Sequence, residues 1–249
     1  MAAARRPGEG RRNSGRIQDR MRSSGAFESP HLRQASDPEM LEAQGRGAGP
    51  GIPRSTEHFV ARDFGGLLGI AGLSDELLKN HFTLYQGYIK AANALLEGLD
   101  ELVREGKGES PAYAGVKRRF GWEYNGIRLH ELYFENLTKS PRPLDPGSSL
   151  FERIKQDFGG MENWGKDFRA TGALRGIGWV VTYVDALRNK LFNAWIDEHD
   201  AGHLAGCAPI LVMDVFEHAF MLDYGVKKAD YVETFMKGIH WDTVAARLA

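Results

Sequence analysis

Residues 74–105, SDELLKNHFTLYQGYIKAANALLEGLDELVRE, carry the pattern from which the organisation of the chain follows. Their apolar residues recur with the period of an amphipathic helix. Ser74 stands where a helix-capping side chain is expected, and Asp75 and Glu76 complement the helix dipole in the first turn. The sequence therefore predicts a long helix over these residues.

A second helical pattern follows after the polar segment GKGESPAYA at 106–114. It spans residues 115–138, GVKRRFGWEYNGIRLHELYFENLT, and predicts an antiparallel helical hairpin. The turn formers of PRPLDPGSS at 141–149 then mark a boundary. We expect an α-hairpin domain at residues 57–142 and a C-terminal α+β domain at residues 143–249.

The part of the chain after this boundary alternates between helical and extended patterns. Helices are expected at 149–159 and 161–172, and two short ones within 228–248. Segments rich in β-branched and aromatic residues predict three strands, the last ending in a helix-forming stretch: 179–186, 190–199 and 208–216. The predicted fold class is α+β, with a long N-terminal α-helical hairpin followed by an α/β lobe that contains a small three-stranded antiparallel sheet.

The N-terminal segment differs in composition from the rest of the chain. Residues 1–55 contain ten Arg, no Lys and six acidic residues, a net charge of +4 that leaves −5 for the other residues of a chain with net charge −1. With eight Gly and one aromatic residue, it predicts a disordered tail over residues 1–56. The alternatives are an RNA-binding arm, a transit peptide, or translation that starts later, at Met21 or Met40.

The rest of the composition limits the cellular setting. The single cysteine, Cys207, excludes an intramolecular disulfide, which leaves a reducing compartment or a fold that is indifferent to redox conditions. No apolar run approaches the roughly 18 residues of a membrane-spanning helix. The six acids of the tail weaken the transit-peptide interpretation, and no apolar signal region follows it. We expect a cytoplasmic protein with no membrane and no nucleic-acid partner.

Four residues stand out as candidates for metal binding. His81 lies in the first predicted helix and His130 in the second, so an antiparallel hairpin can bring the two imidazoles together. Asp214 and His218 lie where the third predicted strand ends, and Asp214 follows an apolar run that disfavours a charge unless a cation or hydrogen bonds stabilise it. Three imidazoles and one carboxylate suit iron, manganese or zinc. The pattern alone leaves open four unrelated buried polar residues.

The segment DVFEHAFMLDYGVKKADYVETFMKGIHW at 214–241 resembles the C-terminal signature of the iron/manganese superoxide dismutases. The resemblance extends over residues 59–249 through three further segments: LFERIKQDFGGMENWGKDFRATGALRGIGWVV, RLHELYFENL and HFTLYQGYIKAANALLEGL. It implies four metal ligands: His81, His130, Asp214 and His218.

The activity that this resemblance implies is the conversion of superoxide to dioxygen and hydrogen peroxide by one-electron cycling of one iron or manganese ion per subunit. Two alternatives remain at this point. One is a metal-free dismutase-like interaction protein, although all four ligands are present here. The other is a different mononuclear non-haem metal enzyme, such as a zinc hydrolase or an iron oxygenase, of which the latter usually needs only two histidines and one carboxylate.

The resemblance also implies residues around the metal. The family usually has a His four residues after the first ligand and a gateway Tyr eight residues after it. Here Tyr85 takes the first place and Tyr88 follows seven residues after His81. We expect Tyr88 to be the gateway, with catalytic function, and Tyr85 to be the second candidate.

The family places a Gln that hydrogen-bonds solvent at the metal in one of two places. Here these places hold Gly126 and His199. The resemblance therefore implies that His199 acts in the outer sphere, which slightly favours iron, and that His203 does not. Trp179 matches a pocket tryptophan of the family, and Phe216 replaces another.

Oligomerisation and substrate capture follow from the same resemblance. Glu217, which in related dimers reaches across the interface to the last ligand, directly precedes His218, so a homodimer or tetramer is expected with both residues at the interface. A second pair of residues that contact each other across the interface in the family is absent from this sequence. Capture of anionic superoxide by a body of net charge −5 needs local cations. The first candidate is Lys227, and Lys228 and Arg128 are weaker candidates.

Overall fold

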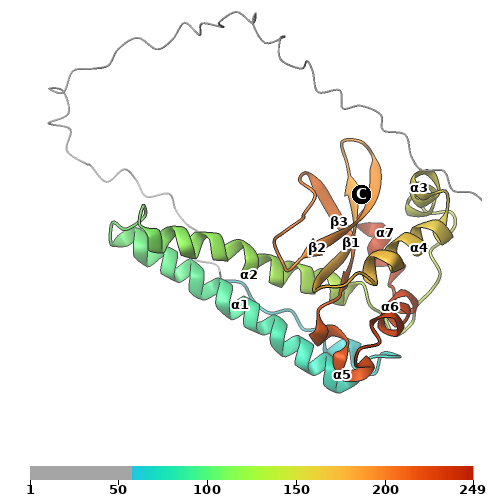
Figure 1. Ribbon diagram of the computed structural model, residues 1–249, viewed down its shortest axis with the longest axis horizontal. Helices are drawn as coiled ribbons and strands as arrows, with labels where there is room; N and C mark the ends of the chain where they lie inside the picture. The colour runs from blue at the N-terminus through green and yellow to red at the C-terminus, as the bar shows by residue number, and fades with distance from the viewer. Residues whose placement is uncertain (1–57, 249) are drawn as a thin grey trace, which may run out of the picture. The chain divides into compact units, whose positions relative to one another are not determined.

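The computed structural model describes residues 58–248, and the predicted tail at 1–56 falls outside them. Helices α1 (Asp75–Arg104) and α2 (Pro111–Glu135) form the predicted hairpin (Figure 1). Ser74 caps α1 as predicted, because its hydroxyl accepts the Leu77 N–H at 3.1 Å.

The second helix begins four residues earlier than the sequence pattern indicated. Ser110 caps it by accepting the Tyr113 N–H at 3.2 Å, and Pro111 occupies the first turn, where its missing N–H costs nothing. The helix also ends at Glu135 rather than at residue 138, since Leu137 pairs in an isolated bridge with Ile239.

Two helices and a sheet form the next part of the chain. Helices α3 (Ser149–Phe158) and α4 (Met161–Gly172) lie close to the predicted ranges. Three antiparallel strands follow in the spatial order β2-β1-β3: β1 (Gly178–Asp185), β2 (Lys190–Asp197) and β3 (Cys207–Asp214).

The central strand β1 requires glycine at its first residue. A Cβ added to Gly178 would lie 2.0 Å from the carbonyl oxygen of Ile196 on β2, so only glycine allows the strands to pair this closely. In the register, Trp179 pairs with Ile196 on one side and with Asp214 on the other. This register brings the last residue of β3 beside Trp179.

The C-terminal segment returns to helix. The stretch after β3 forms a 3₁₀ turn, η2 (Glu217–Ala219), before the short helix α5 (Met221–Tyr224). Helices α6 (Lys228–Lys237) and α7 (Trp241–Ala246) are the two short helices that the sequence predicted. A further 3₁₀ turn, η1 (Gly65–Leu67), precedes α1.

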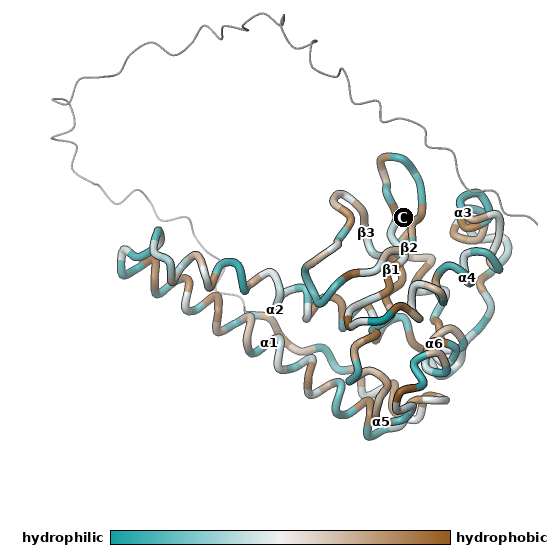
Figure 2. Tube along the Cα trace, in the orientation of Figure 1, coloured by the Kyte–Doolittle hydropathy of each residue, from teal (hydrophilic) through white to brown (hydrophobic). Residues whose placement is uncertain are grey.

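Packing places helices against the small sheet. α2 contacts β3, while α4 contacts β1 and β2, and all eight residues of β1 are buried. Figure 2 shows hydrophobic residues recurring along α1, as its amphipathic pattern indicated. The predicted α+β fold class is confirmed. No helix among residues 58–248 is long and apolar enough to cross a membrane.

Candidate metal centre

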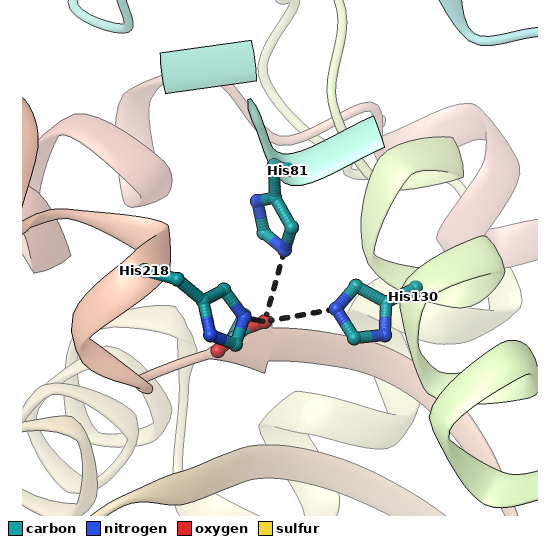
Figure 3. Close-up of side chains that lie close together, drawn as sticks. His81, His130 and His218 are labelled. Atoms are coloured by element: carbon teal, nitrogen blue, oxygen red, sulfur yellow. Dashed lines mark hydrogen bonds and ion pairs between the residues drawn. The ribbon is translucent and has the colours of Figure 1, made fainter. Parts of the chain in front are cut away.

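The four predicted ligands come together from four separate elements. His81 lies on α1, His130 on α2, Asp214 at the end of β3 and His218 in η2. Their ligand atoms all lie within 4.8 Å of one another. Figure 3 shows the three labelled histidines around one carboxylate oxygen.

Distances to that oxygen describe a tight cluster. Asp214 Oδ2 lies 3.2 Å from His81 Nε2, 3.6 Å from His130 Nε2 and 3.1 Å from His218 Nε2. The side chains of His81, His130 and Asp214 have no exposed area, whereas 28% of the His218 side chain is exposed. The cluster is therefore buried on three sides and reaches the surface at His218.

One imidazole nitrogen points into the cluster without a hydrogen bond. His130 Nδ1 donates to the carbonyl oxygen of Gly126 at 2.6 Å, which leaves the lone pair of Nε2 directed toward the cluster. Among the described residues, buried His130 Nε2 finds no hydrogen-bond partner. An unpaired buried polar atom is costly, and a bound cation would satisfy it. The donor set thus fits a metal ion.

Electrostatics favour the protonation states that a metal requires. Burial lowers the pKa of His81, and burial together with His81 lowers that of His130 well below the ordinary value, so both imidazoles are neutral. Burial by itself would raise the pKa of Asp214, but His218 and His81 outweigh it, and the carboxyl pKa is lowered. Three imidazoles and an ionised carboxylate suit iron, manganese or zinc.

Hydrogen bonds fix the orientation of Asp214. The Phe216 N–H donates to Oδ1 at 2.8 Å, so that this oxygen is held while Oδ2 faces the histidines. The hydroxyl of Tyr231 donates to the Asp214 carbonyl oxygen at 2.7 Å and lies 3.2 Å from Tyr133 Oη, whose hydrogen it can accept. Such partners orient metal ligands in many proteins.

The predicted outer-sphere residues form a hydrogen-bonded chain. Trp179 Nε1 donates to His199 Nδ1 at 3.1 Å, and His199 Nε2 lies 2.8 Å from Tyr88 Oη. Burial lowers the pKa of His199 to about 4, so the ring is neutral. Because Nδ1 accepts a hydrogen, the neutral ring carries its own hydrogen on Nε2 and donates it to Tyr88.

The two tyrosines of α1 have different surroundings. Tyr85 donates its hydroxyl hydrogen to Glu131 at 2.9 Å and accepts the Arg62 N–H at 3.1 Å. Tyr88 instead contacts His199, and its ring centroid lies 5.1 Å from that of His130. Burial raises the pKa of Tyr88, so its hydroxyl stays protonated.

A glycine allows Tyr88 to lie against α2. A Cβ added to Gly126 would come within 2.6 Å of Tyr88 Cδ1. The tyrosine ring therefore fills the space beside position 126, where the family resemblance places a Gln in many iron-containing dismutases. Phe216, in the place of a family tryptophan, stacks on His218 with ring centroids 5.2 Å apart and packs 5.0 Å from His199.

The candidate cations differ in how they are engaged. Arg128 pairs with Glu131 on the same helix. Lys228 donates to the carbonyl oxygens of Leu174 and Gly176 and so ties down a loop. Lys227 is exposed, which leaves it available to an anion.

Sequence reasoning missed Trp122 and Glu198 beside His199, and Arg119, which lies over the Trp122 ring. The Trp122 ring lies 4.4 Å from the His199 ring and 5.5 Å from the Tyr88 ring, measured between centroids. A signal was present, since Trp122, Gly126 and His130 are spaced by four residues and share one face of α2.

The hairpin, the small sheet and the buried cluster of three histidines and one aspartate are those of a candidate metalloprotein with a single metal ion. A sequence profile described as iron/manganese superoxide dismutases, C-terminal domain, matches residues 146–247. The chain is 38% identical over 177 residues to manganese superoxide dismutase 2 of Haloferax volcanii, covering 70% of this chain and 86% of the relative.

Two further relatives carry iron in their names. The iron superoxide dismutase of Cupriavidus metallidurans is 37% identical over 188 residues, 72% of this chain and 90% of that protein. The iron superoxide dismutase of Aquifex pyrophilus is 31% identical over 183 residues, 72% and 85% of the two chains. The chain belongs to the iron/manganese superoxide dismutase family. It is an oxidoreductase whose function is superoxide dismutation.

Proposed function

We propose that dismutation takes place at one iron or manganese ion held by four ligands: His81, His130, Asp214 and His218. The observation that carries this proposal is the convergence of their ligand atoms within 4.8 Å around buried His130 Nε2, which has no hydrogen-bond partner among the described residues. A metal ion would satisfy that nitrogen and balance the ionised Asp214.

When bound, the ion supplies one-electron exchange, so that one superoxide is oxidised to dioxygen and a second, with two protons, is reduced to hydrogen peroxide. The protein provides the environment for this exchange. Neutral His81 and His130 offer lone pairs, and Asp214 contributes the negative charge that favours the higher oxidation state.

Tyr88 and His199 are proposed as the catalytic residues of the outer sphere. His199 donates from Nε2 to Tyr88, and this leaves the hydroxyl hydrogen of Tyr88 free to be donated to another acceptor. A protonated phenol beside His130 can supply a proton to an oxygen species at the centre. These contacts of Tyr88 support Tyr88, rather than Tyr85, as the gateway residue.

Iron is slightly favoured as the metal in this proposal. The reason is the histidine at position 199, which the family resemblance associates with enzymes that use iron or accept either metal. The relatives include proteins named for iron and proteins named for manganese, so their names support both metals equally.

A homodimer or tetramer with Glu217 and His218 at its interface completes the proposal. Glu217 is exposed and His218 is partly exposed in the single chain. Nearby Met221, Leu222 and Val226 expose 45%, 53% and 91% of their area, respectively, and an interface would cover them. Analytical ultracentrifugation of the metal-loaded protein tests this, and a purely monomeric species would contradict it.

We further propose a cytoplasmic location, which cell fractionation tests.

The experiment that tests the proposed centre combines elemental analysis with a superoxide-decay assay. The purified protein is expected to hold about one iron or manganese ion per chain and to accelerate superoxide decay. Protein that holds iron or manganese without activity would refute the proposed catalytic centre. Protein that takes up neither metal after reconstitution would favour the interaction protein considered above.

A further inference from the structure

Trp122 and Glu198 connect two elements that both approach His199. Trp122 Nε1, on α2, donates to Glu198 Oε2 at 3.0 Å across a separation of 76 residues. Glu198 directly follows the end of β2 and directly precedes His199 in the chain. This bond therefore ties the backbone beside His199 to the helix that carries His130.

The backbone of Glu198 adopts a conformation that non-glycine residues rarely use. Its φ angle is +48°, in the left-handed region, and among the described non-glycine residues only Asn189 shares a positive φ. A glutamate in this conformation needs surrounding contacts to hold it there. The hydrogen bond from the Trp122 indole is such a contact. The backbone turn that it stabilises orients the side chain of the next residue, His199.

Trp122 itself is held from a second side. The Arg119 guanidinium lies 3.7 Å from the centroid of the Trp122 ring, and Arg119 is fixed by an ion pair with buried Glu123 at 2.8 Å. The indole ring in turn lies beside the rings of His199 and Tyr88. The ring is thus placed to shield the hydrogen bond between His199 and Tyr88 from water.

We propose that Trp122 and Glu198 form a clasp that positions His199 for the dismutase reaction, with Trp122 held in place by Arg119. Both are positioning residues, because they act through His199. The inference rests on the proposed outer-sphere role of His199 and extends it to a pair of side chains that lie one step further from the centre.

The test uses four variants of the full-length, metal-loaded protein. Trp122→Phe removes the indole donor and keeps a ring, while Glu198→Gly removes the acceptor and relieves the left-handed backbone. Glu198→Gln keeps an acceptor oxygen. Trp195→Phe is the matched control, because Trp195 makes the same kind of bond to Asp197 at 2.7 Å. Thermal unfolding and metal content are measured for each.

The readouts are kcat/KM per bound metal, the affinity for azide, and the electron paramagnetic resonance spectrum, which reports the surroundings of the ion. Trp122→Phe and Glu198→Gly are expected to lower kcat/KM by about 3- to 10-fold and to change the spectrum and the azide affinity. This loss is smaller than the loss expected when a residue that hydrogen-bonds a metal ligand is replaced. Glu198→Gln and Trp195→Phe are expected to match the wild type in all three.

Two results would overturn the clasp. In the first, the wild-type protein is active, and Trp122→Phe and Glu198→Gly both show the same spectra and kinetics as the wild type. The other is a loss in Glu198→Gln as large as that in Trp122→Phe, since the effect would then come from charge. An inactive wild-type protein would instead refute the proposed function, so the two failures are distinguishable.

Discussion

Trp179 donates its indole hydrogen to His199 Nδ1 at 3.1 Å, and this bond selects the tautomer of His199. Since the neutral ring has one hydrogen, the bond leaves it on the nitrogen that faces Tyr88. A residue of the central strand thus controls a hydrogen bond beside the proposed metal centre, although Trp179 is not one of the proposed ligands.

Replacing Trp179 with Phe should separate this role from packing. The change leaves His199 Nδ1 unpaired and is expected to destabilise the fold by about 1–3 kcal/mol and to lower dismutase activity per bound metal. Trp164→Phe is the control, because Trp164 is also buried and its indole donates to Thr182 at 3.3 Å. Urea unfolding and superoxide decay are the measurements. Equal activity losses in both variants would argue against tautomer control.

Replacing His199 with Gln should shift the metal preference. Gln offers a different donor geometry to Tyr88. We expect the ratio of activities between separately reconstituted iron and manganese forms to change by about 10-fold, as alterations beside metal ligands often do. His203→Gln is the control, since His203 contacts the His199 carbonyl oxygen at 2.9 Å and Tyr183, away from the ligand cluster. An unchanged ratio in His199→Gln would remove this residue from the outer sphere.

Replacing Asp214 with Asn should reduce metal binding. The amide keeps the shape of the side chain but lacks the negative charge that balances the ion, so metal content per chain after reconstitution should fall well below that of the wild type. Asp185→Asn, at the far end of β1, removes another buried carboxylate that pairs with Arg188. This control should retain its metal in elemental analysis. Full metal occupancy in Asp214→Asn would exclude Asp214 as an essential ligand.

The stability of the metal-free protein should depend on pH through His199. Its pKa is about 4 in the folded state against 6.5 as the ordinary value, so between these values the unfolded state binds more protons. The free energy of unfolding therefore falls as pH decreases from about 6.5 to about 4. His199→Gln lacks this contribution and should lose less stability over that range in denaturant titrations. Parallel pH profiles would contradict the assignment.

The sequence predicted most of the fold because its local signals agree with the long-range packing. The cap of α1 and the strand segments are examples, and the start of α2 was missed even though Ser110 followed by Pro111 is a local signal. The proposed division into domains at residues 57–142 and 143–249 stays a prediction, and so does the disorder of the tail.

The candidate ligands were predicted from residue types and from the family resemblance, and the structure brings all four together. The contact between Trp122 and Glu198 was not predicted, because it depends on how two side chains separated by 76 residues meet in space. Similarly, no local pattern indicates that Tyr88 fills the space beside Gly126.

The close approach of Tyr88 to Gly126 restricts how this enzyme can be converted to another arrangement of the metal surroundings. A glutamine introduced at position 126 would occupy the volume of the Tyr88 ring, since even a single added carbon comes within 2.6 Å of it. Introducing a glutamine at position 126 therefore requires Tyr88 to change as well. Substitutions at positions 88 and 126 are therefore expected to be epistatic, because a glutamine at position 126 fits only once the Tyr88 ring has been replaced or displaced.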